Sequence, residues 1–167
     1  MKMLLRTALL LRFLMPSFLI PSLLTAGLLT VGFLPLAALA ETQAPQTHTV
    51  EMLNRDDSGP MPFAPGYLVI QPGDTVKFLA THAGHNSATI EGMLPEGGKA
   101  FFGNINEEIE VTLNEEGIWG IKCSPHYTMG MVMLIQVGDI AATEDDLPDD
   151  LPPAARQRFL DILSENS

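Results

Sequence analysis

Six short runs of aliphatic, β-branched and aromatic residues, separated by turn-forming residues, constrain the fold of this chain more than any other feature. They occupy residues 49–54, 67–71, 75–80, 107–113, 117–122 and 131–137. In the third run Val76, Phe78 and Ala80 fall on one face, and the fourth run has the same period of two. This period is typical of sheets with one buried face. We therefore expect an all-β fold, a small antiparallel β-sandwich, with Trp119 in its core.

The sequence changes character after the last of these runs. Residues 143–153 are rich in aspartate and proline. In Pro153–Glu165 four apolar residues share one helical face, and a proline stands at the start of the helix, where it is tolerated. The four are Ala155, Phe159, Ile162 and Leu163. We expect residues 140–167 to form an acidic linker and a short helical tail that packs on the sandwich.

Residues 1–40 have the pattern of an export signal. Three basic residues lie within the first twelve positions, and no charged residue occurs from position 13 to position 40. The small residues Ala38 and Ala40 suit a signal peptidase, and polar sequence follows them. We expect cleavage after Ala40 and a periplasmic location. Because the apolar stretch is long enough to span a bilayer, an uncleaved anchor is the alternative, although three prolines weaken a continuous helix.

The chain after Ala40 is strongly acidic. It holds all twenty acidic residues and six of the nine basic ones, so the formal net charge of the mature chain is −14. Nucleic acid and anionic lipid repel such a chain, and we expect neither as a partner. Residues 41–46 are predicted to form a disordered leader, and residues 47–139 one domain. Within that domain, residues 90–103 are predicted to form a loop or a short helical turn over the sandwich.

The single cysteine lies in a segment rich in potential metal ligands, Cys123-Ser124-Pro125-His126-Tyr127-Thr128-Met129-Gly130-Met131. A proline near its start and a glycine near its end allow the segment to curl, so that a thiolate, an imidazole and a thioether can face one ion. Soft sulfur ligands favour Cu(I), and imidazole suits copper in both oxidation states. One cysteine in an exported chain cannot form an internal disulfide, which leaves an intermolecular bridge, a reactive thiol or a ligand, and we favour the ligand. A core thiol among packing methionines is the alternative.

A second ligand segment is predicted after the third run, in Thr81-His82-Ala83-Gly84-His85-Asn86-Ser87. His82 and His85 compete for the role of metal ligand. Gly84 allows the backbone to approach a neighbouring segment closely, and the amide of Asn86 can tie one loop to another through hydrogen bonds. We therefore predict His85 as the ligand and keep His82 as the alternative.

With these two segments the chain resembles the cupredoxins, the small blue copper proteins, and among them most closely the pseudoazurins. The resemblance extends over residues 47–139 and includes four further segments. These are Met52-Leu53-Asn54, Pro72-Gly73-Asp74-Thr75-Val76, Pro95-Glu96-Gly97 and Ile135-Gln136-Val137-Gly138-Asp139. It implies a Greek-key β-sandwich with a helical tail.

The resemblance also implies a site for one type 1 copper ion. His85, Cys123 and His126 would be the strong ligands and Met131 the weak axial one, with Met129 as a neighbour. Such a ligand set lies between the preferences of Cu(I) and Cu(II), so electron loss requires little rearrangement. The implied function is one-electron transfer by a monomer, without a small-molecule substrate and without enzymatic turnover.

The route of the electron is implied by the same resemblance. In this family electrons leave by the ring edge of the downstream histidine, here His126, inside an apolar patch that Gly84, Pro125 and Met129 would supply. Pseudoazurins surround this patch with lysines that dock on copper nitrite reductase. Two basic residues stand at matching positions here, Arg55 and Lys122. The partners expected are redox proteins, with copper nitrite reductase and a cytochrome as candidates.

Two other functions are compatible with a cysteine and histidines. A cysteine enzyme would use Cys123 as nucleophile and a histidine as base, but the three-residue spacing to His126 leaves no obvious substrate cleft or oxyanion donors. A periplasmic copper storage or delivery protein would not need an axial methionine. The absence of the Cys-x-x-Cys-His attachment signal argues against a haem carrier.

Overall fold

The computed structural model describes residues 43–166 of this chain. The predicted signal segment and its cleavage position therefore lie outside the described residues, as do the first two residues of the predicted leader. Within residues 43–166 no helix is long and apolar enough to cross a membrane.

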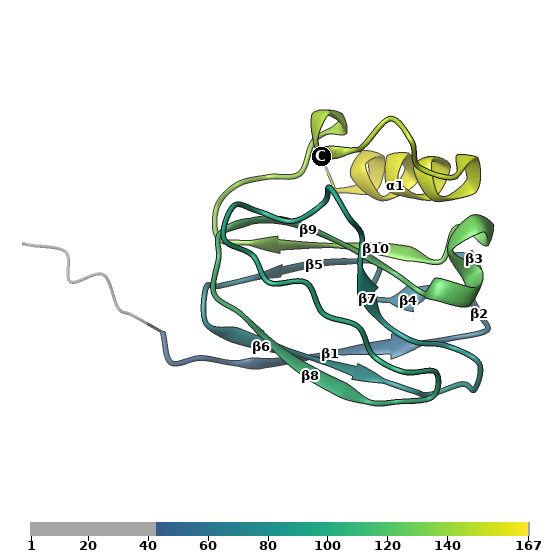
Figure 1. Cartoon of the computed structure of the whole chain (residues 1–167), viewed down its shortest axis with the longest axis horizontal. Helices are drawn as coiled ribbons and strands as arrows, with labels where there is room; N and C mark the ends of the chain where they lie inside the picture. The colour runs from purple at the N-terminus through teal and green to yellow at the C-terminus, as the bar shows by residue number, and fades with distance from the viewer. Residues whose placement is uncertain (1–42, 167) are drawn as a thin grey trace, which may run out of the picture. The chain divides into compact units, whose positions relative to one another are not determined.

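Two four-stranded sheets face one another and form the body of the domain (Figure 1). The elements in chain order are β1 (Thr47–Met52), β2 (Arg55–Asp56), β3 (Gly59–Pro60), β4 (Phe63–Ala64), β5 (Tyr67–Ile70), β6 (Asp74–Leu79), β7 (Ala88–Thr89), β8 (Ile109–Leu113), β9 (Gly117–Lys122), the 3₁₀ turn η1 (Ser124–Met129), β10 (Val132–Val137), the 3₁₀ turn η2 (Glu144–Asp146) and α1 (Pro153–Glu165). One sheet has the strand order β4-β1-β6-β8 and the other β5-β10-β9-β7. A small hairpin, β2-β3, stands apart from both sheets.

All six predicted strands are present, with ends that differ from the prediction by no more than two residues. The prediction of a purely antiparallel sandwich is wrong, because β1 pairs with β6 and β5 with β10 in parallel. Parallel partners require a crossover rather than a hairpin, and β6 and β10 are each reached through such a connection from an earlier strand. The two-residue strands were missed, since so short a run carries no readable period.

The core between the sheets follows the period of two. Val76 and Phe78 of β6 are fully buried, and Ala80 packs against the same cluster. Trp119 is 2% exposed and belongs to that core, as predicted. β10 is buried along its whole length, and its two faces serve different clusters: Met133 packs between the sheets, whereas Leu134 faces outward under α1. A strand covered on both faces reads as a continuous apolar run.

The C-terminal helix α1 has the predicted bounds and buries the four predicted residues. They pack with Val132 and Leu134 on the outer face of the second sheet. The preceding acidic segment is more than a linker, because Leu147 and Leu151 are buried in the same cluster. The segment is thereby attached to the sheet that carries the cysteine.

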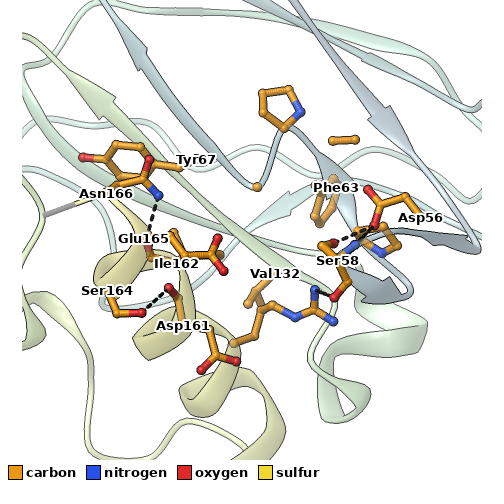
Figure 2. Close-up of a pocket in the computed structure, with 15 residues that line it drawn as sticks. Asp56, Ser58, Phe63, Tyr67, Val132, Asp161, Ile162, Ser164, Glu165 and Asn166 are labelled. Carbon is orange, nitrogen blue, oxygen red and sulfur yellow. Dashed lines mark hydrogen bonds between the residues drawn. The ribbon is translucent and has the colours of Figure 1, made fainter.

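Helix α1 also contacts the parts of the fold that border the ligand segments. A Cβ atom at Gly130 would lie 2.8 Å from the Ala154 carbonyl oxygen, so the end of η1 fits closely against the helix start. Arg158 donates hydrogen bonds to the carbonyl oxygens of Ser58 (3.4 Å) and Pro60 (3.0 Å) in the β2-β3 hairpin. A hollow of about 530 Å³ lies between this hairpin and the helix, and Asp56, Tyr67 and Glu165 line it (Figure 2).

Residues 43–46 precede β1 without helix or strand. The backbone N–H of Gln46 donates to Asp74 Oδ1 at 2.8 Å, and its carbonyl oxygen accepts from the Thr75 N–H at 2.8 Å. The last residue of the predicted leader is therefore held against β6, and the ordered contacts begin one residue before Thr47.

Candidate metal centre

Three side chains from two separate loops meet at one end of the sandwich. Cys123 follows β9, His126 lies in η1, and His85 lies in the loop after β6. The Cys123 Sγ is 3.5 Å from His126 Nδ1 and 3.7 Å from His85 Nδ1, and the two ring nitrogens are 3.1 Å apart. A point equidistant from these three atoms lies about 2.0 Å from each, near the bond lengths of roughly 2.0 to 2.3 Å that nitrogen and thiolate ligands make with Zn²⁺.

The turn that carries two of these residues is built by its proline and its glycine. Pro125 stands in the first turn of η1, where a missing N–H costs no helical bond, and Gly130 ends it at a φ of 87°. The Cys123 N–H donates to the Met131 carbonyl oxygen at 3.0 Å, and the Met131 N–H donates to the His126 carbonyl oxygen at 3.1 Å. These bonds close the segment on itself, as its sequence predicted.

Asn86 ties the two ligand-bearing loops together. Its Oδ1 accepts from the Ser124 N–H at 2.7 Å, while its Nδ2 donates to the Gly103 carbonyl oxygen at 2.8 Å and to the Ser124 Oγ at 3.2 Å. The expectation that this amide joins one loop to another is confirmed. Asn86 directly follows His85, and its partner Ser124 directly follows Cys123. Because Asn86 is also fully buried, it fixes the distance between the His85 and Cys123 side chains.

Asn54 sets the orientation of the His85 ring, a role that sequence reasoning missed. The Nε2–H of His85 donates to Asn54 Oδ1 at 2.8 Å, which leaves Nδ1 unprotonated and directed toward Cys123. The backbone N–H of Asn54 also donates to Nδ1 of His82 at 2.9 Å, so that ring is engaged elsewhere. The structure brings His85, and not His82, to the cysteine.

Asn106 holds the other side of the His85 loop and was also missed. Its Oδ1 accepts from the Gly84 N–H at 2.6 Å, and its N–H donates to the His85 carbonyl oxygen at 2.8 Å. Its φ of 65° is in the left-handed region, which asparagine tolerates better than most residues. An asparagine between Ile105 and Glu107 gave no pattern from which this contact could be predicted.

Burial favours the neutral forms of both buried donors. Burial lowers the pKa of His85, and the electrostatic effects of His126 and then His82 lower it further. Burial raises the pKa of the Cys123 thiol, which the backbone amides of Asn86 and His126 partly oppose by lowering it. A neutral imidazole is ready to bind a metal, whereas the thiol must lose its proton, and a bound cation supplies the charge that makes this favourable.

Copper fits this donor set. The grouped donors are two imidazole nitrogens and one sulfur, without a carboxylate, and such a set is typical of blue copper sites. Met131 is fully buried in the core and bonded through its backbone to both Cys123 and His126. A thioether from this residue would suit copper and would add little for Zn²⁺ or Mg²⁺.

Comparison with known proteins identifies the family. The model of copper binding proteins of the plastocyanin/azurin family matches residues 50–138. The chain belongs to this family. Pseudoazurin of Paracoccus pantotrophus is 43% identical over 125 residues, which is 74% of this chain and 86% of that protein. Pseudoazurin of Methylorubrum extorquens is 47% identical over 90 residues, or 54% of this chain and 61% of that protein.

A solved structure supports the same family assignment as the sequence relatives of this cupredoxin. The crystal structure of pseudoazurin from Methylobacterium extorquens AM1 aligns with a TM-score of 0.66 at 36% identity and covers 72% of this chain and 99% of that one. The predicted resemblance to pseudoazurins and the predicted fold class are therefore confirmed, and copper is the cofactor of this cupredoxin.

The three grouped side chains of the cupredoxin differ in their access to solvent. Cys123 and His85 are fully buried, whereas His126 is partly exposed. Of the three residues that the resemblance implies would form an apolar patch with it, Pro125 and Met129 are exposed and Gly84 is partly exposed. The His126 ring is thus the part of the site that reaches the surface.

Proposed function

We propose that this chain is a one-electron carrier in which His85 Nδ1, Cys123 Sγ and His126 Nδ1 bind one copper ion and the Met131 thioether is the axial ligand. Copper supplies an electron that can be lost and regained. The observation that carries the proposal is the triangle of three donor atoms, 3.1 to 3.7 Å apart, at the end of a rigid sandwich.

The protein contributes a site that changes little between oxidation states. Asn54 orients the His85 ring, Asn86 fixes the separation of the two loops, and the backbone bonds of Met131 close the cysteine loop. A preset geometry between the preferences of Cu(I) and Cu(II) keeps rearrangement small when an electron moves. Burial of Cys123 and His85 excludes water, so His126 is the route by which an electron enters or leaves.

Burial also argues against the two competing functions. A catalytic thiol must be reached by its substrate and is activated by a lowered pKa, whereas Cys123 is fully buried and burial raises its pKa. A delivery protein must release its ion to a partner, and only the His126 side of the site is accessible. An electron can cross such a covered site, but an ion or a substrate cannot do so readily.

A redox titration of the copper-loaded protein tests the carrier function. Ascorbate should bleach it and hexacyanoferrate(III) should restore its colour, with one electron per protein in each direction over many cycles. Loss of copper during the first reduction, or a colourless complex, would favour storage instead.

The cellular setting is part of the proposal. The basic and then apolar residues 1–40 support export to the periplasm with cleavage after Ala40, and copper nitrite reductase and a cytochrome are candidate partners for a monomeric carrier. N-terminal sequencing of the protein recovered from the periplasm of an expressing bacterium should begin at Glu41. Recovery of uncleaved chain in the membrane fraction would support the anchor.

A further inference from the structure

The partly exposed His126 lies beside a larger apolar surface than its own turn provides. Three of the five large apolar side chains that are exposed in residues 43–166 lie on the segments around it: Met129 (52%), Ile105 (56%) and Phe102 (69%). The segments are fixed to one another, because Asn86 donates both to the Gly103 carbonyl oxygen and to Ser124 Oγ. We call Phe102, Ile105, Pro125 and Met129 the site-end apolar face.

This face is preformed rather than loose. The segment that carries Phe102 and Ile105 is bonded to the His85 loop at two places, by the Gly103 N–H to the Ser87 carbonyl oxygen (2.9 Å) and by the Asn106 N–H to the His85 carbonyl oxygen (2.8 Å). Apolar side chains that are exposed together on a fixed backbone mark a contact surface for another molecule. The position of His126 within it makes a redox partner the appropriate occupant.

Acidic side chains stand on three of the segments that meet at this end of the fold. The Glu107 carboxylate accepts from the Asn104 N–H at 2.7 Å and is held in the same loop as Ile105. Asp150 lies close enough to Tyr127 of η1 to raise the pKa of that phenol, after the effect of burial. Asp57 is exposed in the hairpin that begins directly after Asn54.

The basic residues near the face are fewer. Arg55 is exposed in the hairpin, and Lys122 lies with its Nζ 4.9 Å from the centre of the Tyr127 ring. Lys99, exposed three residues before Phe102, is a third basic residue. On the same segments Asp56 and Glu108 add to the three carboxylates, and residues 41–167 hold twenty acidic and six basic residues in all. The face therefore has an apolar centre and a rim that is negative on balance.

We propose that the site-end apolar face docks a redox protein whose own contact face has an apolar centre surrounded by lysines and arginines. This proposal rests on the proposed electron-carrier function and specifies its partner. Opposite charges at the rim raise the rate of encounter, while the apolar centres bring His126 to the partner's redox group.

Two triple variants with the same change in net charge separate the effect of charges at the rim from the effect of net charge on the reaction rate. Asp57→Asn, Glu107→Gln and Asp150→Asn remove three charges around the face. Glu115→Gln, Glu116→Gln and Asp139→Asn remove three from the opposite end, before β9 begins and after β10 ends. The copper-loaded, reduced proteins are mixed with ferric cytochrome c, a basic protein, and separately with the anion hexacyanoferrate(III). In each reaction one electron passes from the protein to the probe's Fe(III), and no bond is formed or broken.

The site-end triple should react with cytochrome c about 3- to 10-fold more slowly at low ionic strength and faster with hexacyanoferrate(III), and added salt should reduce both differences. The opposite-end triple should change each rate less than twofold. Equal effects of the two triples, or none, would overturn the proposal.

Apolar contact is tested by a second pair of variants. Phe102→Ser with Ile105→Ser should slow the reaction with cytochrome c severalfold at any salt concentration, whereas Val69→Ser, at a residue 50% exposed on β5, should not. In an NMR titration of the reduced protein with cytochrome c, the amides that shift should include those of Ile105 and Met129. Shifts confined to another surface would overturn the docking face.

The outcomes distinguish this inference from the function on which it rests. A wild-type protein that neither probe oxidises would contradict the carrier function. A protein that both probes oxidise, at rates that every variant shares, would contradict the docking face alone.

Discussion

The side-chain oxygen of Asn54 lies 2.8 Å from Nε2 of His85, and the backbone N–H of the same residue lies 2.9 Å from Nδ1 of His82. One residue thus orients His85 toward Cys123 and engages Nδ1 of His82, the nitrogen that corresponds to the one His85 directs at the cysteine. Hydrogen-bond partners of this kind fix the tautomer of a metal ligand and raise its basicity. Asn54 therefore belongs to the metal centre as the residue that orients the His85 ligand.

Replacing Asn54 should weaken the site without removing a ligand. Asn54→Leu deletes the acceptor and should lower copper affinity by about 10- to 100-fold, because His85 loses its fixed tautomer. A competition titration with a copper chelator measures the affinity. Asn54→Asp, which keeps an acceptor oxygen, should retain most of it, and Asn114→Ala in an exposed turn should have no effect. Equal affinity in the leucine variant and the wild type would refute the role.

The choice between the two candidate histidines is directly testable. His85→Ala should abolish the intense charge-transfer band of the copper protein, because its Nδ1 is one of the three grouped donors. His82→Ala should keep the band, because that ring is exposed and bonded to the Asn54 backbone. The absorption spectrum of each copper-loaded variant is the measurement. The opposite pattern would require a different ligand set.

Asp74 should make stability depend on pH in the acid range. Burial alone would raise the pKa of this carboxyl, but hydrogen bonds from the Gln46 N–H, the His48 ring and the Gln71 N–H lower it below its ordinary value. The folded state then binds the proton less tightly than the unfolded state. The stabilisation is fully present above the unfolded pKa and is lost as the pH falls through the folded pKa.

Urea unfolding of the wild type and Asp74→Asn from pH 7 to pH 2 measures this contribution. The variant should be less stable at pH 7, and the difference between the two proteins should shrink as the pH falls below about 4. A difference that stays constant over this range would show that the carboxylate charge is not what stabilises this end of β6.

The C-terminal helix should be needed for the stability of the domain. Phe159 is fully buried between α1 and the outer face of the second sheet, so Phe159→Ala should lower the free energy of unfolding by about 3 to 5 kcal/mol. Phe102→Ala removes the same ring from an exposed position and should cost less than about 0.5 kcal/mol. A loss below about 1 kcal/mol at Phe159 would mean that the helix is dispensable.

Sequence patterns predicted the elements that have a clear period and missed those that depend on distant contacts. The 3.6-residue period of α1 gave its bounds and its buried face, and the period of two located β6. The parallel pairing of β1 with β6 was missed because pairing direction depends on the path of the chain, which no local pattern records. The two-residue strand β7 forms where the chain meets the end of β9.

The candidate site shows the same division. Cys123 and His126 were found because their donor atoms are uncommon and closely spaced in the sequence, and His85 because Gly84 and Asn86 flank it in a loop after a strand. Asn54 and Asn106 were not assigned a role, because asparagine is frequent in turns. Each hydrogen-bonds to the His85 loop only once remote parts of the chain have come together in the fold. Leu147 and Leu151 lie in an acidic stretch whose composition hid their burial.

Addition of one equivalent of Cu(II) to a purified chain beginning at Glu41, followed by its visible absorption spectrum, tests the central claim most directly. An intense blue band should appear in the wild type, should bleach with a one-electron reductant and return with an oxidant, and should be absent in Cys123→Ser. A wild-type complex without the band, or a band that survives in Cys123→Ser, would contradict the proposed copper centre.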